Sequence, residues 1–238
     1  MQTSGLRVVV TGASRGIGLA LARQFHQAGN PVVLVGRDEA ALQQAVASLP
    51  GAQYACADLS RMADCLQLVA RFPDVQVLVN NAGVQCAGAL DDLTPQALCD
   101  ELQTNLLAPM LLTQAWLPQL RQQPVAAVVN VCSVLGWVPK PSAVSYCASK
   151  AGLLNFSQGL RAQLAGSSIR VFELVPPLVD TAMTQGRGQG KLSPEQVAAA
   201  FWHGWQRDQW QIHIGKARLA RLLVRWLPTV ARRVLSRS

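Results

Sequence analysis

The chain has 238 residues, of which 50% are apolar and 14% charged, and its formal net charge is +8. This apolar content suffices for a sizeable core and excludes a disordered chain, while no apolar run reaches the roughly 18 residues that span a bilayer. Val8–Val10 is also too short for the apolar region of a signal peptide, so we expect a cytoplasmic protein. The six cysteines lack metal-ligand spacing, which predicts reduced thiols and no metal site.

Short Val-rich segments alternate with helical patterns along the chain. The predicted strands are Arg7–Thr11, Pro31–Val35, Gln53–Ala57, Val75–Val79, Val125–Val131 and Ile169–Val175, with Ile212–Ile214 as a seventh. The predicted helices are Ile17–Ala28, Asp38–Leu49, Pro95–Leu120 with a kink at Pro109, and Ser145–Leu164. This alternation predicts an α/β fold with a doubly wound parallel sheet, the Rossmann fold. Without an internal linker, residues 1–215 form one domain and residues 216–238 an extension.

A glycine-rich turn, Thr11–Gly18, follows the first strand and leads into the first helix. Glycines at positions 12, 16 and 18 let a pyrophosphate approach amide groups at the helix N-terminus, where the helix dipole favours negative charge. In this strand–turn–helix context, the turn predicts a dinucleotide site.

The end of the second strand indicates which dinucleotide is bound. Arg37 lies at the position where a carboxylate would bind ribose hydroxyls, and Arg15 lies inside the glycine turn. Two cations near the ribose favour the 2′-phosphate of NADP. We interpret Asp38, which directly precedes a helical run, as the N-cap of that helix.

Tyr146 and Lys150 share one face of a predicted helix. An ammonium group beside a phenol lowers the phenol pKa, which suits a residue that exchanges protons with a carbonyl or an alcohol. Ser133 follows the fifth strand at the carboxyl edge of the sheet, and its hydroxyl could hold the same oxygen. Asn105 is a polar residue in an otherwise apolar helical stretch.

Six motifs occur in a characteristic order: TGASRGIG at 11–18, ADL at 57–59, NNAG at 80–83, Asn105, Ser133 and Tyr146-x-x-x-Lys150. With them the chain resembles the single-domain short-chain dehydrogenase/reductase family over residues 5–215. The extension and the pattern Pro-Pro-x-Val-x-Thr from Pro176 resemble the DltE-like subgroup. Where the family commonly has Pro-Gly, this chain has Pro176-Pro177, which predicts a different loop beside the nicotinamide.

The resemblance implies specific roles. Tyr146 is the acid/base, Ser133 polarises the carbonyl, Lys150 holds the nicotinamide ribose, and Asn105 steadies a water in the proton relay. The implied cofactor-binding residues line the sheet edge: Gly12, Ser14, Arg15, Gly16, Ile17, Gly18, Arg37, Asp58, Leu59, Asn81, Ala82, Gly83, Tyr146, Lys150, Pro176, Val179 and Thr181. It also implies a homo-oligomer built on helices Pro95–Leu120 and Ser145–Leu164.

The sequence therefore predicts an NADP-dependent oxidoreductase acting on a small carbonyl or alcohol. The alternative is a catalytically lapsed NADP-binding regulatory or scaffold protein. Expected pocket neighbours are mostly apolar and favour an apolar substrate, although Arg187 and Lys191 on the loop Ala182–Leu192 leave an anionic one open: Gln85, Cys86, Leu135, Trp137, Val138 and Met183. Ser193 and Pro194 begin a further helix.

The positive charge gathers in the extension. Residues 216–238 hold seven of the 21 basic residues and none of the 13 acidic ones, so residues 1–215 carry a net charge of +1 and do not indicate nucleic-acid binding. Apolar residues recur at helical spacing, and Pro228 should divide the extension into two helices. Two interpretations remain open. The apolar stripe packs on the domain or a partner subunit, or it makes peripheral contact with an anionic membrane.

Overall fold

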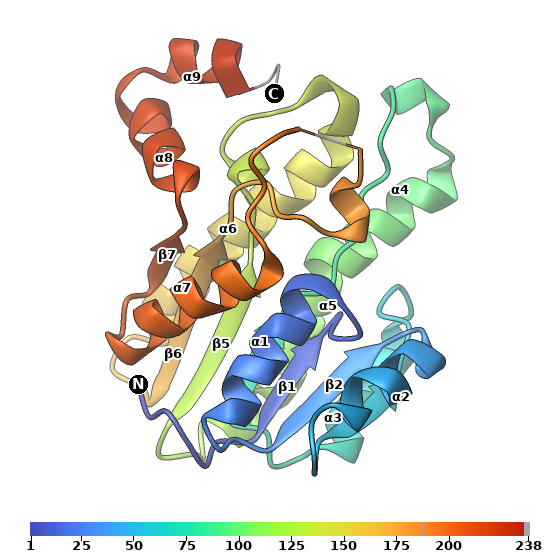
Figure 1. Ribbon diagram of the computed structural model, residues 1–238, viewed down its shortest axis with the longest axis vertical. Coiled ribbons are helices and arrows are strands. Elements are labelled where there is room, and N and C mark those ends of the chain that lie inside the picture. The colour runs from blue at the N-terminus through green and yellow to red at the C-terminus, as the bar shows by residue number, and fades with distance from the viewer. Residues whose placement is uncertain (187, 236–238) are drawn as a thin grey trace.

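The computed structural model describes residues 1–186 and 188–235 and consists of one seven-stranded sheet with helices on both faces (Figure 1). All neighbouring strands are parallel, in the order β3-β2-β1-β4-β5-β6-β7. The strands are β1 Val8–Thr11, β2 Val32–Gly36, β3 Gln53–Cys56, β4 Val77–Asn80, β5 Ala126–Val131, β6 Ile169–Val175 and β7 Gln211–His213. The predicted doubly wound sheet and its single domain are confirmed.

One or more helices connect each strand to the next, and α8 and α9 follow β7. Their bounds are α1 Gly16–Gln27, α2 Glu39–Ala47, α3 Met62–Arg71, α4 Pro95–Leu102, α5 Ala108–Leu120, α6 Val144–Gln163, α7 Pro194–Gln206, α8 Lys216–Trp226 and α9 Pro228–Leu235. None of the helices in the described ranges combines the length and apolar character needed to cross a membrane.

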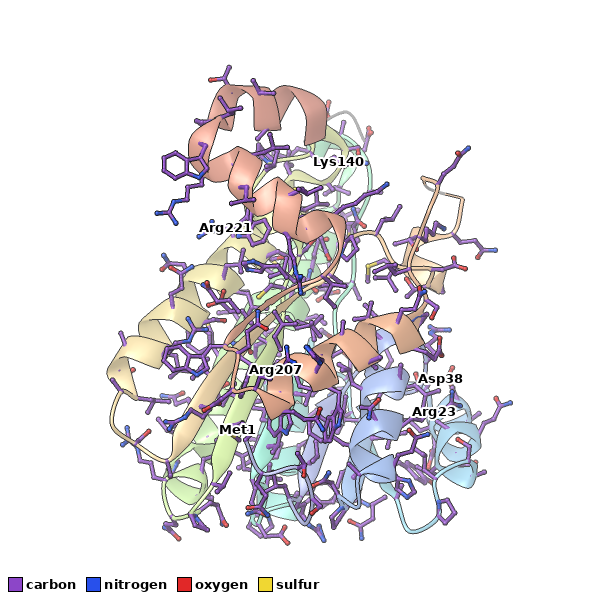
Figure 2. All side chains as sticks on the ribbon, turned by 60° about the vertical axis from the view of Figure 1, so that its left-hand side comes forward. Met1, Arg23, Asp38, Lys140, Arg207 and Arg221 are labelled. Atoms are coloured by element: carbon purple, nitrogen blue, oxygen red, sulfur yellow. The ribbon has the colours of Figure 1, made fainter. Side chains whose placement is uncertain are left out.

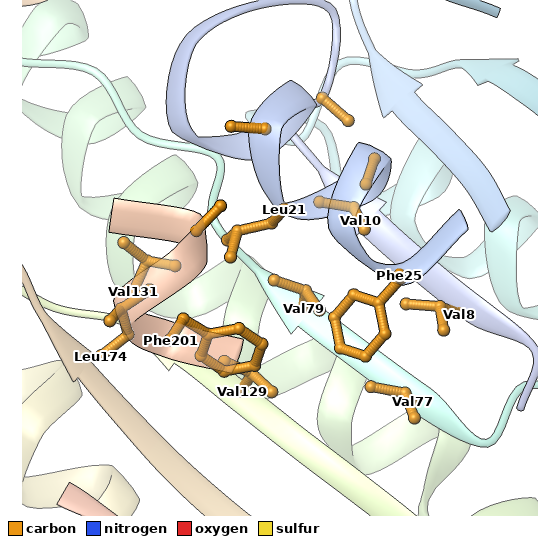
Figure 3. Packing of buried hydrophobic residues seen from close by; sticks show 14 of the residues in the cluster. Val8, Val10, Leu21, Phe25, Val77, Val79, Val129, Val131, Leu174 and Phe201 are labelled. Carbon is orange, nitrogen blue, oxygen red and sulfur yellow. The ribbon is translucent and has the colours of Figure 1, made fainter. Parts of the chain in front are cut away.

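Alternate residues of each strand enter two separate cores. Val8 and Val10 of β1 pack with α1, α2 and α7, and the close-up in Figure 3 shows Phe25 and Phe201 filling this layer. Val9, between them, packs with α3, α5 and α6. Both faces of the sheet are therefore covered, which explains why the strands are apolar at consecutive positions.

Two helical features differ from the sequence prediction. Helix α3 was not predicted; its N-cap, Arg61, is not a residue type that favours this position and makes no side-chain capping bond. The long helix expected over Pro95–Leu120 is α4 and α5 joined by one π-helical turn, Gln103–Leu107. This turn ends two residues before Pro109, the position of the expected kink, and proline supplies no N–H to the carbonyl four residues earlier.

Other helix boundaries follow their local signals. Ser193 caps α7 in a capping box with Gln196, and Pro194 occupies the first turn. Pro228 separates α8 from α9, as predicted.

The strand order reverses between β1 and β4, and in such sheets ligands bind outside the carboxyl ends of the strands at that point.

Candidate active site

The loop Thr11–Gly18 between β1 and α1 is a cradle made of backbone atoms. Gly12 and Gly16 have positive φ angles of 63° and 58°. A Cβ on Gly18 would lie 2.3 Å from the carbonyl oxygen of Gly12, and one on Gly12 would lie 2.8 Å from the Cα of Ala82. Any side chain here would push the loop apart, so these positions require glycine.

Helix α1 presents an open N-terminus to this cradle. Its N-cap, Arg15, makes no side-chain capping bond, and the first turn contains no acidic residue. The first N–H groups of a helix and its dipole both favour an anion at this end. The cradle and the helix end therefore fit the pyrophosphate of a dinucleotide.

Thr11 and Asn81 hold the cradle in shape from below. The Thr11 hydroxyl donates to the Val79 carbonyl at 3.2 Å and accepts from the N–H groups of Asn81 and Ala82, each at 3.0 Å. The Asn81 side-chain amide donates to the carbonyls of Thr11 and Gly12, at 2.9 and 3.1 Å. The segment after β4 thus fixes the glycine loop after β1.

Two arginines line the cavity above the cradle. Arg15 and Arg37 are exposed, and within residues 1–186 and 188–235 neither forms a salt bridge with a carboxylate. The neighbouring Asp38 caps α2, since its Oδ1 accepts from the N–H of Ala41 at 3.1 Å. Figure 2 labels Asp38 beside the blue helices of this end of the molecule. The predicted capping role of Asp38 is confirmed, and both guanidinium groups are available to an anion.

Asp58 adds a carboxylate near Arg37. Its Oδ1 accepts from the backbone N–H and the hydroxyl of Ser60, at 3.0 and 2.8 Å. The backbone bond, with the hydroxyl bond and the charges of Arg37 and Arg61, outweighs partial burial and holds the pKa of Asp58 below its usual value. Asp58 is therefore ionised at neutral pH.

Ser133, Tyr146 and Lys150 meet at the carboxyl end of β5. The Tyr146 hydroxyl forms a hydrogen bond with the Ser133 hydroxyl, which also accepts from the N–H of Leu135 at 3.1 Å. Lys150 is buried, donates from Nζ to the Val131 carbonyl at 2.9 Å, and lies 5.8 Å from the centroid of the Tyr146 ring. The structure brings together the three residues that the sequence predicted to act together.

The protonation of this group differs from the prediction. Burial raises the pKa of Tyr146 to about 12, more than the hydrogen bond from Ser133 lowers it. Burial also lowers the pKa of Lys150. The pKa of Tyr146 therefore lies above that of a free phenol in this structure, because loss of solvation outweighs the hydrogen bond from Ser133. Stabilisation of the phenolate by Lys150 stays a prediction.

Asn105 does not present a free amide to the site. Its Oδ1 accepts from the N–H of Val84 at 2.8 Å, while Nδ2 donates to the carbonyl of Val84 at 2.8 Å and to the hydroxyl of Ser149 at 3.2 Å. The side chain is thus a clamp on the segment after Gly83. Both N–H groups of Nδ2 are thus used, while the backbone carbonyl of Asn105 receives no N–H from Pro109 and could accept a hydrogen bond from a water.

Glu101 is a buried residue of the site that sequence reasoning missed. It lies one helical turn before Asn105, accepts from the N–H of Cys86 at 2.9 Å, and accepts a short hydrogen bond from the hydroxyl of Ser145. Its negative charge is one of the contributions that raise the pKa of Tyr146. The i, i+4 spacing from Asn105 on a helix was the available sequence signal.

One cavity of about 1040 Å³ joins the cradle to the Tyr146 group. Within residues 1–186 and 188–235, two of the predicted site residues, Gly18 and Asn105, are not among the residues that line this cavity. The others line it: Gly12, Ser14, Arg15, Gly16, Ile17, Arg37, Asp58, Leu59, Asn81, Ala82, Gly83, Ser133, Tyr146, Lys150, Pro176, Val179 and Thr181.

The expected pocket neighbours divide into two sets. Gln85, Leu135 and Met183 line the cavity, together with Lys140 and the α8 residues Ala217 and Ala220. Three others lie elsewhere among the described residues. The Cys86 N–H is bound to Glu101, Trp137 packs edge-on against His213, and Val138 is buried in the core.

The segment after β6 also lines the cavity, from Pro176 to Thr184. Thr181 begins a short helical turn, and Thr184 completes its capping box. Lys191, expected as a possible anchor for an anion, donates from Nζ to the Thr184 carbonyl at 2.6 Å and pairs with Asp180 at 3.3 Å. Arg187 lies outside the described residues.

Comparisons with known proteins agree with this geometry. A family model described as short chain dehydrogenase matches residues 7–192. The uncharacterized oxidoreductase DltE of Bacillus subtilis is 39% identical over 224 residues, which cover 89% of each protein. A short chain dehydrogenase from Burkholderia cenocepacia, in complex with NADP, has a TM-score of 0.88 and 27% identity over 97% of both chains. A short chain dehydrogenase/reductase from Burkholderia phymatum, in complex with NAD, has a TM-score of 0.86 and 25% identity over 94% of both chains.

Proposed function

Because this chain belongs to the short-chain dehydrogenase/reductase family, in the DltE-like subgroup, we propose that it transfers a hydride between NADP(H) and a carbonyl or secondary alcohol of an apolar small molecule. One observation carries the proposal. The Ser133, Tyr146 and Lys150 group lies in the same cavity as a backbone cradle that fits a pyrophosphate. A carbonyl bound between them would lie within reach of both a proton donor and a dinucleotide.

The chain supplies the proton and the position in this reaction. The hydroxyl of Tyr146 donates its proton to the carbonyl oxygen as that oxygen gains negative charge, and the Ser133 hydroxyl donates a second hydrogen bond to it. Lys150, held by the Val131 carbonyl, places a positive charge beneath the Tyr146 ring and stabilises the phenolate that remains. NADPH, when bound, supplies the hydride. Oxidation of an alcohol uses the same groups in reverse.

NADP is the proposed cofactor because of the two arginines. Arg15 and Arg37 line the cavity, and neither pairs with a carboxylate in the described ranges. Their charge-assisted hydrogen bonds would favour the 2′-phosphate, which NAD lacks. Family membership alone leaves the choice open, since the two Burkholderia structures hold different cofactors.

The walls near Tyr146 support an apolar substrate. Val134, Leu135, Leu178 and Met183 line this side of the cavity, and Lys191 is already bonded to Asp180 and Thr184. Apolar walls around a few polar groups favour a ligand with one reactive oxygen on an apolar body.

A homo-oligomer in the cytoplasm is also proposed. Leu107, at the end of the π-helical turn, and Val144, at the start of α6, are exposed apolar residues on the helices expected to pack against another copy. Sedimentation at micromolar concentration should show a dimer or tetramer, and a monomer would contradict this part of the proposal.

A substrate screen tests the proposed activity. The purified protein is incubated with NADPH and a panel of aliphatic and aromatic ketones and aldehydes, and NADPH consumption is followed. We expect turnover with apolar members of the panel and none with short carboxylate-bearing ones. NADPH that binds tightly without turnover of any carbonyl, or of any secondary alcohol with NADP, would favour the lapsed regulatory protein instead.

A further inference from the structure

Helix α8 has two faces of opposite character. Its small residues Ala217 and Ala220 are buried and line the wall of the cavity. Its large apolar residues are turned away from the domain: Leu219, Leu222 and Trp226 are 63%, 55% and 70% exposed. These three residues of the apolar stripe therefore do not pack on the chain's own domain. Packing on a partner subunit and contact with a membrane remain the two interpretations for them.

The arginines of α8 fix this orientation. Arg218 donates from Nε to the His213 carbonyl at 2.9 Å. The guanidinium of Arg221 lies 5.2 Å from the centroid of the Trp137 ring, and Figure 2 shows Arg221 on α8, at the end of the molecule far from Met1. Since two cations contact the domain, the helix cannot roll its leucines inward without losing these contacts.

The exposed apolar surface continues into α9. Leu227, between the helices, and Val230, in the first turn of α9, are also exposed. Figure 1 shows α8 and α9 in red, together at one end of the molecule. We define Leu219, Leu222, Trp226, Leu227 and Val230 as the apolar tail face.

The charge of this segment of the sequence indicates the partner of the apolar tail face. Residues 216–238 contain seven basic residues and no acidic one, while residues 1–215 carry a net charge of only +1. A second copy would bring two sets of arginines together if the faces paired, and its near-neutral body offers no compensating charge. An anionic lipid surface would accept the exposed apolar side chains and also attract the basic residues of the segment.

We propose that the apolar tail face docks the protein on an anionic lipid bilayer. Leu222 and Trp226 enter the boundary between headgroups and acyl chains, while Arg225, which lies over the Trp226 ring, contacts the headgroups. Because the opposite face of α8 lines the cavity, docking places the cavity wall about one helix diameter, roughly 10–12 Å, from the lipid. This inference goes beyond the proposed function, and binding can be measured without any substrate.

Vesicle binding by the full-length protein tests the proposal. Sedimentation with vesicles of phosphatidylcholine and phosphatidylglycerol in equal parts is compared with sedimentation with phosphatidylcholine alone. We expect binding to the anionic vesicles, weaker binding as salt rises, and little binding to the neutral ones. The double variant Leu222→Ser/Trp226→Ser should lose at least about tenfold in affinity, which corresponds to about 1.4 kcal/mol.

A matched control is available on α3. Met62 and Leu66 are exposed apolar residues of similar exposure, at 55% and 52%, and lie outside the tail. Met62→Ser/Leu66→Ser should bind anionic vesicles as tightly as the unmodified protein, and both double variants should keep the original melting temperature. A parent protein that ignores anionic vesicles, or whose binding survives Leu222→Ser/Trp226→Ser, would overturn the proposal. An oligomer that dissociates in the tail variant while the parent ignores vesicles would instead assign the face to a second copy.

Discussion

The nucleotide end of the cavity, around Gly12 and Gly18, and its carbonyl end, around Tyr146, depend on different physical effects. At the nucleotide end, shape comes from backbone sterics, because a single Cβ on Gly18 would lie 2.3 Å from the Gly12 carbonyl. At the carbonyl end, reactivity comes from burial, which raises the pKa of Tyr146 and lowers that of Lys150. A local motif determines the first property. The second depends on everything packed around the side chain.

Replacement of Tyr146 should have the largest effect, because it should abolish most turnover at the carbonyl end and leave NADPH binding at the nucleotide end unchanged. Tyr146→Phe removes the proton donor and keeps the ring, so kcat/KM for carbonyl reduction should fall by about 10²–10⁴-fold. The cradle is untouched, so the Kd for NADPH, measured by fluorescence titration, should stay the same. Unchanged turnover in this variant would contradict the assigned acid.

Replacement of Gly18 should act on the nucleotide end alone. The new methyl of Gly18→Ala has no room beside the Gly12 carbonyl, so the loop must open and NADPH affinity should fall by at least about tenfold, or about 1.4 kcal/mol. Gly159→Ala on α6 is the matched control, since its Cβ would meet nothing within 4 Å. The control should keep NADPH affinity and gain up to about 1 kcal/mol of stability. Equal affinities for the two variants would refute the steric argument.

Replacement of Arg37 should change cofactor choice rather than binding as such. We expect the unmodified protein to bind NADPH at least about tenfold more tightly than NADH, and Arg37→Ala to remove most of that preference. Arg61→Ala is the control, because Arg61 also lies near Asp58 but does not line the cavity. The prediction fails if the unmodified protein shows equal affinity for NADPH and NADH.

Replacement of Glu101 should shift the pKa of Tyr146 without changing Ser133, Tyr146 or Lys150. Alcohol oxidation needs the Tyr146 phenolate, so its kcat/KM should rise with pH towards the pKa of Tyr146, which burial places at about 12. Glu101→Gln removes a negative charge that raises this pKa, so the rise should move to lower pH. Asp100→Asn, on the adjacent residue, should leave the profile in place. A profile that does not move, or moves to higher pH, would exclude an electrostatic role for Glu101.

The contrast between local motifs and packing through the whole fold also explains how much of the structure the sequence could predict. The glycine cradle, the Asp38 and Ser193 caps and the break at Pro228 follow from residues within one turn of each other, and the structure confirms them. The clamp made by Asn105 and the buried carboxylate of Glu101 depend on Val84 and Ser145, which reach them only through the fold. The spacing of Glu101 and Asn105 indicates a shared helix face, but it does not predict partners that lie far away in the sequence.

Residues 216–238 also show that a local sequence pattern does not predict long-range contacts. Their helical spacing and their break were visible in the sequence, but periodicity cannot tell which face meets the domain. The choice is made by Ala217 and Ala220, which are small enough to pack closely, and by Arg218 and Arg221, which find partners on the domain. The larger apolar residues are left outside.

Isotope transfer tests the central claim most directly. The protein is incubated with an apolar ketone from the screen and NADPH that carries deuterium at C4 of the nicotinamide, on each face in turn, and the alcohol is analysed by mass spectrometry. We predict one deuterium on the carbinol carbon from one labelled face only, and no labelled alcohol above background from Tyr146→Phe. Unlabelled alcohol from both forms of NADPH, or equal label transfer by Tyr146→Phe, would contradict hydride transfer with Tyr146 as the acid.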